Sequence, residues 1–221
     1  VAPSLLDEWG VQKAELGPAM SAALFGLAFG SLLSGPLADR VGRKPAVIYS
    51  VLLFGVFSLA TAWSTSIGSL TLLRFITGLG LGAAMPNSIT LLSEYCPSKR
   101  RTMIVSAMLC GFPLGAAVGG LLAGYLIPSF GWRSVLVVGG VVPILLCVAL
   151  PWLLPESVRY MVLKGYPSAR IRAVLQRIKK EGAERAEHFV IAEKIADGHS
   201  AIRAILTSPH RTVTGLLWLS C

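Results

Sequence analysis

Apolar residues along this chain occur in long runs that short polar segments interrupt. No charged residue occurs within residues 17–38 or within residues 45–73. A helix that crosses a bilayer needs about 20 predominantly apolar residues, so each run is long enough to do so. The pattern predicts five membrane spans, at residues 17–38, 45–63, 67–92, 102–127 and 134–154. The predicted fold class is therefore all-α, a polytopic transmembrane helical bundle.

The chain divides into three parts by polarity. Residues 1–154 form the predicted bundle, residues 155–210 are polar, and residues 211–221 are apolar and predict the start of a further span. Within the polar part, Ser168 is expected to cap a helix. Its apolar positions recur at helical spacing: Ile171, Val174, Leu175 and Ile178. An amphipathic helix of this kind suits the membrane surface or the ends of the bundle.

Charge is sparse and unevenly distributed. Charged residues make up 14% of the chain, where a soluble domain would carry about 25%. The net charge is +9, but 11 of the 20 Lys and Arg residues lie in residues 159–211. Under the positive-inside rule, the loops at 39–44, 93–101 and 155–210 are cytoplasmic. This clustering favours a cytoplasmic loop over a nucleic-acid surface.

A highly charged turn separates the first two spans. Asp39 lies where the first helix is expected to end, and Arg43 and Lys44 lie where the second begins. Both placements oppose the helix dipole, so these charges are expected to have partners elsewhere in the fold or to act as topology signals. The alternative is that Arg40, Arg43 and Lys44 only hold the loop on the cytoplasmic side.

The turn reads G-P-L-A-D-R-V-G-R-K-P and resembles the signature loop between the second and third helices of the major facilitator superfamily. The resemblance implies a conformational latch whose acid contacts the other half of a transporter. The latch positions would be Gly35, Asp39, Arg40, Gly42, Arg43 and Lys44. The spans would then be helices two to six of an amino-terminal half, with the first helix and the carboxy-terminal half missing.

Arg74 is the only charged residue inside a predicted apolar span. A buried arginine near the bilayer centre costs at least about 2.5 kcal/mol unless it is paired or hydrated, and outward snorkelling is the alternative. The helix resembles the fourth-helix motif of the family, where this arginine is implicated in proton coupling. The corresponding coupling or cavity positions are Arg74, Gly78, Gly82, Pro86 and Asn87. The guanidinium would also suit a carboxylate substrate, or an acid upstream of Val1.

Two further cytoplasmic segments carry opposed charges. Glu94 and Arg101 resemble the E-x6-R element of sugar-porter-like members, and Glu156 and Arg159 lie in a segment that resembles their P-E-S/T-x-R element. The resemblance implies an ion-pair network of Glu94, Arg101, Glu156 and Arg159 with the latch loop. The alternative is a solvated cluster that contributes about 0–1 kcal/mol per pair.

Small residues recur at four-residue intervals in two spans. One stripe is Ala22, Gly26, Gly30 and Ser34, and the other is Gly111, Gly115, Gly119 and Ala123. In a membrane such stripes let helix backbones approach closely, so both are expected at helix interfaces.

The segments A-P-S-L-L-x-E-W-G and R-F-x-x-G-x-G-x-G-A-A-x-P-N, with the latch loop, are most similar to the aromatic acid:proton symporters. The resemblance implies proton-coupled uptake of benzoate-like or hydroxybenzoate-like carboxylates by alternating access, across a bacterial inner membrane. No enzyme, cofactor, metal or nucleic-acid partner is expected. The alternatives are a porter for another organic acid or a sugar, and a truncated membrane fragment that does not transport.

Overall fold

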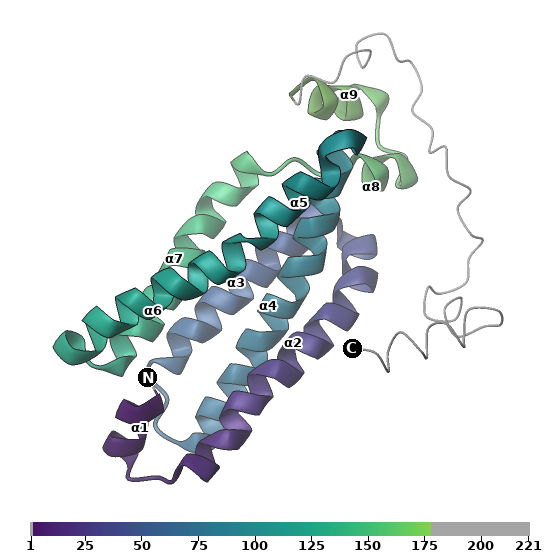
Figure 1. Cartoon of the computed structure of the whole chain (residues 1–221). Helices are drawn as coiled ribbons and strands as arrows, with labels where there is room; N and C mark the ends of the chain where they lie inside the picture. The colour runs from purple at the N-terminus through teal and green to yellow at the C-terminus, as the bar shows by residue number, and fades with distance from the viewer. Residues whose placement is uncertain (1, 178–221) are drawn as a thin grey trace, which may run out of the picture. The chain divides into compact units, whose positions relative to one another are not determined.

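The computed structural model describes residues 2–177, and these residues are helical with short connections (Figure 1). The expected span at 211–221, Ile178 and most of the polar part 155–210 lie outside the described residues. The elements are α1 (Ala2–Trp9), α2 (Lys13–Val41), α3 (Arg43–Thr61), α4 (Ile67–Tyr95), the 3-10 helix η1 (Ser98–Arg100), α5 (Arg101–Leu109), α6 (Gly111–Phe130), α7 (Trp132–Leu153), α8 (Val158–Leu163) and α9 (Ser168–Arg177).

Five helical stretches of the described residues are long and apolar enough to cross a membrane. They are α2, α3, α4, the pair α5–α6 and α7. These five helices confirm the predicted fold class. α2, α4 and the pair α5–α6 reach several residues beyond an expected span boundary, and α3 and α7 each begin two residues early, because helical hydrogen bonding continues into the polar segments that mark the membrane surface.

The helices pack in a chain of neighbours: α4 lies against α2 and α3, α3 lies against α7, and α7 lies against α6 (Figure 1). The closest approach is between α2 and α4. A Cβ atom added at Gly30 would lie 2.2 Å from the carbonyl oxygen of Leu79, and one added at Gly78 would lie 2.2 Å from that of Ala23. Cβ atoms added at Gly26 and Gly82 would likewise each lie 2.1 Å from a backbone carbonyl oxygen of the other helix. The first small-residue stripe therefore forms a helix interface, as expected.

The second small-residue stripe differs from the expectation. Added Cβ atoms at Gly111, Gly115 and Gly119 would meet nothing within 4 Å in the part of the chain that the structure describes. This stripe lies on α6, which packs mainly on α7 through another face. Spacing alone shows that a face is smooth, whereas contact also needs a neighbouring helix on that side.

The expected fourth span is divided at Cys110 into α5 and α6. Pro113 has no backbone N–H and cannot bond to the carbonyl of Leu109, so one helical hydrogen bond is lost there. The path stays helical, because Cys110 donates to the Ser106 carbonyl at 3.0 Å and Leu114 donates to the Cys110 carbonyl at 3.2 Å.

Two short helices follow the bundle. α8 begins after Ser157, whose hydroxyl accepts from the Tyr160 backbone N–H at 3.1 Å. In α9, Ile171 and Leu175 are buried, which agrees with the amphipathic pattern. Ser168 is the first residue of α9 rather than the residue before it, so the expected cap position is displaced by one residue.

Candidate functional site

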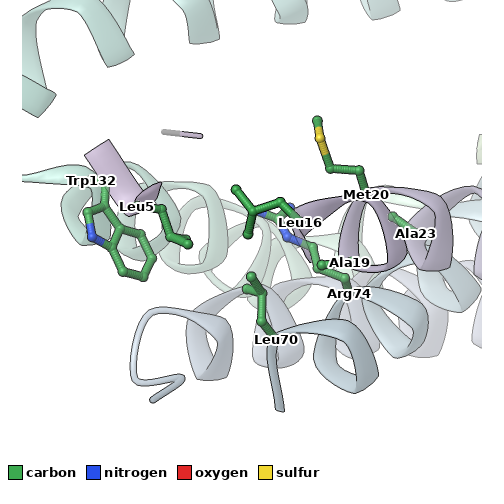
Figure 2. A pocket seen from close by; sticks show the side chains of 8 residues that line it. All are labelled: Leu5, Leu16, Ala19, Met20, Ala23, Leu70, Arg74 and Trp132. Carbon is green, nitrogen blue, oxygen red and sulfur yellow. The ribbon is translucent and has the colours of Figure 1, made fainter. Parts of the chain in front are cut away.

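A cavity of about 240 Å³ lies where α1, α2, α4 and the start of α7 meet. Its lining is Leu5, Leu16, Ala19, Met20, Ala23, Leu70, Arg74 and Trp132. Figure 2 shows Trp132 and Leu5 at one end and Met20 and Ala23 at the other, with Leu16, Leu70 and Arg74 between them. We call this space the Arg74 cavity.

Arg74 is the only charged residue in the lining of this cavity. The first turns of α4 place it one helical turn beyond Leu70, which is buried. Among the described residues, Arg74 has no hydrogen bond or ion-pair partner, so its guanidinium donors are available to a ligand. A guanidinium in an apolar cavity is suited to an anion, above all a carboxylate that it can bind with two parallel hydrogen bonds.

The other positions expected around the cavity lie elsewhere. Gly78 and Gly82 face the backbone of α2, and the Asn87 side chain is buried and donates to the Ala83 carbonyl at 2.9 Å. Pro86 is half-buried within α4. These residues shape α4 and its interface with α2, and only Arg74 of the expected set lines the cavity.

A polar cluster closes the Trp132 end of the cavity. The indole N–H of Trp132 donates to Glu8 Oε2 at 2.6 Å, and Arg133 Nη1 lies 2.6 Å from Glu8 Oε1. Arg133 also donates from Nε to the carbonyl of Ala62, the residue after α3, at 3.1 Å. The hydrogen bonds that Glu8 accepts from Trp132 and from Arg133 lower the pKa of its carboxyl below the usual range. Sequence reasoning missed this cluster, because Glu8 and Trp132 are far apart in the chain.

At the opposite end of the bundle, the latch loop meets the end of α4 and residues 155–157. We call this region the latch end. Arg43 forms an ion pair with Glu94 in which both side chains are largely buried. The second oxygen of Glu94, Oε2, accepts from the Ser157 hydroxyl at 2.6 Å. Ser157 is fully buried, so Glu94 connects the beginning of α3 to the beginning of α8.

Glu156 binds the backbone at the first turn of α3. Its Oε1 accepts from the N–H groups of Arg43 and Lys44, both at 3.1 Å. A carboxylate at a helix N-terminus satisfies unpaired N–H groups and interacts favourably with the helix dipole. Gly42 has a φ of 103°, and an added Cβ would lie 2.7 Å from Glu156 Oε2. The loop therefore needs glycine here for its conformation and for room.

Lys44 and Tyr160 add two further contacts at the latch end. Lys44 donates from Nζ to the Pro151 carbonyl at 2.5 Å. Residue 155 is proline and has no N–H, so α7 cannot itself supply a hydrogen bond to that carbonyl. Tyr160 donates to the carbonyl of Arg40 at 3.0 Å. Burial, with smaller effects of Tyr166 and Glu156, raises the pKa of the Tyr160 phenol.

The other residues predicted for the latch loop and the ion-pair network are more exposed than Arg43, Glu94 and Glu156. Among the described residues, Asp39 has no hydrogen bond or ion-pair partner. Arg40 is exposed, and added atoms at Gly35 would meet nothing within 4 Å. Arg101 is exposed at the start of α5, and no described ion pair joins it to Glu94, which binds Arg43 instead. Arg159 is also exposed.

Similar known proteins show which family this chain belongs to. A family model described as Major Facilitator Superfamily matches residues 1–221. The chain belongs to this superfamily. It is 48% identical to a 4-hydroxybenzoate transporter of Pseudomonas aeruginosa and 41% identical to a gallate transporter of Pseudomonas putida. Each match covers 100% of this chain and 49% of the relative. The chain thus spans about half the length of these relatives.

The fold comparison agrees with the family. A solved structure of the proton:xylose symporter XylE matches 83% of this chain and 46% of its own with a TM-score of 0.69, at 22% identity. This similarity shows the fold alone. The family match confirms the superfamily that the latch loop resembles. Together with the five membrane-length helices of the described residues, it identifies a multi-pass membrane protein. It also agrees with the expectation that this protein is not an enzyme.

Proposed function

We propose that this chain acts as the amino-terminal half of a secondary transporter that takes up aromatic carboxylates with protons across a bacterial inner membrane. A single observation carries the proposal. Arg74 is the only charged residue in the lining of an otherwise apolar cavity. One cation at the side of an apolar space is the arrangement that a benzoate-like anion requires.

The lining matches both parts of such a solute. The guanidinium of Arg74 binds the carboxylate, and the ring lies against Leu16, Leu70 and Trp132. The volume of about 240 Å³ limits the solute to a small molecule of this class. The relatives named as transporters of 4-hydroxybenzoate and gallate carry solutes with this chemistry, an aromatic ring and a carboxylate.

The two ends of α4 support alternating access. Arg74 lies near one end of this helix, in the cavity, and Glu94 lies at the other end, in the ion pair with Arg43. A shift of α4 that accompanies binding would therefore strain the latch end. Asp39 is exposed there and, as the resemblance implies, contacts the second half of the transporter. We place the latch end on the cytoplasmic side, because its loops are basic.

Uptake of labelled 4-hydroxybenzoate into proteoliposomes tests the proposal, with the full-length transporter that contains this chain as its first half. We expect uptake driven by an inward proton gradient. Arg74→Ala should abolish this uptake, and Arg74→Lys, which retains the charge but not the planar fork, should retain a fraction of it. Leu72→Ala, an exposed residue of the same helix, is the matched control and should transport normally. Uptake that ignores the proton gradient, or that persists in Arg74→Ala, would refute the proposal.

A further inference from the structure

We propose that Glu8 is a positioning residue that holds the indole of Trp132 as a fixed wall of the Arg74 cavity and thereby sets the affinity for the aromatic ring of the solute. This inference rests on the proposed function, since it assigns a role in the same site. The Glu8 carboxylate itself lies outside the cavity, does not touch the solute, and acts on the site through Trp132.

The indole is held from three directions. Its N–H donates to Glu8 Oε2 at 2.6 Å, and its ring meets the ring of Trp9 edge-on, with 6.1 Å between the centroids. The guanidinium of Arg133 lies over it at 4.6 Å. Trp132 is 2% exposed, and it belongs to a buried apolar cluster with Leu5, Leu16 and Leu70. Trp132 also lines the cavity.

Glu8 is the residue that joins these contacts. One carboxylate oxygen binds the indole N–H and the other binds Arg133, whose Nε is in turn bonded to the Ala62 carbonyl. The orientation of the indole is therefore tied through Glu8 and Arg133 to the end of α3. Without Glu8, a buried N–H loses its only described acceptor, which costs about 1–3 kcal/mol and favours another ring orientation.

A fixed indole favours ring binding for an energetic reason. A wall that is already ordered loses little side-chain entropy when the solute enters, whereas a mobile wall must be ordered during binding. Aromatic rings also prefer particular offset or edge-on arrangements, so a rotated indole would present the wrong surface. The predicted consequence is a change in KM with little change in the maximal rate, because Glu8 touches neither the solute nor the latch end.

The test is the kinetics of 4-hydroxybenzoate uptake by the full-length transporter in proteoliposomes. Glu8→Ala should raise KM by roughly tenfold, which is what the loss of one charge-assisted hydrogen bond implies, with a maximal rate within about twofold of wild type. Glu8→Gln should restore most of the affinity, because the amide oxygen can accept the indole N–H. Glu15→Ala, an exposed acid on the first turn of α2, is the matched control and should leave KM unchanged.

A double-mutant cycle separates positioning from general damage. Trp132→Phe removes the indole N–H but keeps an aromatic ring, so adding Glu8→Ala to it should cost little more. Additive effects, a fall in the maximal rate at constant KM, or failure of Glu8→Gln to restore KM would each overturn the inference. These outcomes require a transporter that takes up 4-hydroxybenzoate, so absence of uptake in wild type refutes the proposed function, and normal uptake by Glu8→Ala refutes only the role of Glu8.

Discussion

At the scale of single residues, two charged side chains of the latch loop, Arg43 and Lys44, have partners that only the fold brings near. Arg43 binds Glu94, and Lys44 binds a carbonyl that Pro155 leaves without a helical donor. Both cations are at the N-terminus of α3, where they oppose the helix dipole. The carboxylate of Glu156 lies on the same N-terminus and offsets this cost.

Removing one member of the Arg43–Glu94 pair should therefore destabilise the protein. We expect Arg43→Gln to lower the free energy of unfolding by about 1–3 kcal/mol, because it leaves a largely buried carboxylate with one hydrogen-bond donor fewer. Thermal unfolding in detergent measures the change. Arg101→Gln removes an exposed arginine and is the matched control, for which we expect almost no change. Equal effects of the two substitutions would contradict the assigned pairing.

The Glu8 cluster predicts a dependence of stability on pH. The Trp132 N–H and Arg133 lower the pKa of Glu8 in the folded protein, so the folded state holds the proton less tightly than the unfolded chain. The stability that Glu8 contributes is then fully present above the usual glutamate pKa of about 4.3 and is lost as the pH falls through the lower folded value. Melting temperatures of wild type and Glu8→Gln should differ near neutral pH and converge in acid. A difference that is constant with pH would contradict this assignment.

At the scale of helices, the α2–α4 interface depends on the absence of side chains. Gly26 and Gly30 of α2 and Gly78 and Gly82 of α4 each lie against the backbone of the other helix. A backbone carbonyl cannot move aside as the end of a flexible side chain can. The two helices therefore pack backbone to backbone, with the Arg74 cavity near one end of the pair and the latch loop near the other.

Two glycines of α2 provide a matched test of this interface. Gly30→Ala would place a methyl group 2.2 Å from the Leu79 carbonyl oxygen, and we expect it to destabilise the protein by more than about 3 kcal/mol. Gly35→Ala meets nothing within 4 Å and should be neutral or stabilising by up to about 1 kcal/mol through helix propensity. Thermal unfolding of both variants in detergent decides the matter. Similar melting temperatures would show that the helices can separate at little cost.

At the scale of the whole molecule, α4 connects the two ends of the bundle. The ion pair and backbone contacts of the latch end join α3, α4 and α8, and the Glu8 cluster joins α1, α3 and α7. The transport proposal requires these ends to respond to each other and to the second half of the transporter. Asp39 is the exposed acid of the latch loop and is its expected contact with that half.

Asp39→Asn should thus affect transport more than stability. Because Asp39 has no partner among the described residues, we expect the free energy of unfolding to change by less than about 0.5 kcal/mol. Uptake of 4-hydroxybenzoate by the full-length transporter should fall by roughly tenfold, equivalent to a coupling free energy of about 1.4 kcal/mol. Normal uptake with reduced stability would contradict the proposed contact.

The sequence by itself determined the fold class and the family. Several long runs without charge are typical of membrane spans, and the latch loop is a contiguous motif that needs no tertiary contact to be recognised. The same reading identified Arg74, because one charge within an apolar span stands out without any structure. It also indicated that Arg43 and Lys44 need partners, since their positions oppose the dipole of their own helix.

Only the tertiary structure decided which residues are the partners of Arg43 and Lys44. The resemblance implied that Glu94, Arg101, Glu156 and Arg159 form a network with the latch loop, and in the structure α4 brings Glu94 to Arg43, 51 positions away. The carboxylate of Glu156 lies on the N-terminus of α3, where it accepts from the backbone N–H groups of Arg43 and Lys44. Glu8 reaches Trp132 across 124 positions. One small-residue stripe packs and the other does not, although their sequences look alike. Contacts of this kind depend on which helices are neighbours, and the packing of all the helices together determines that.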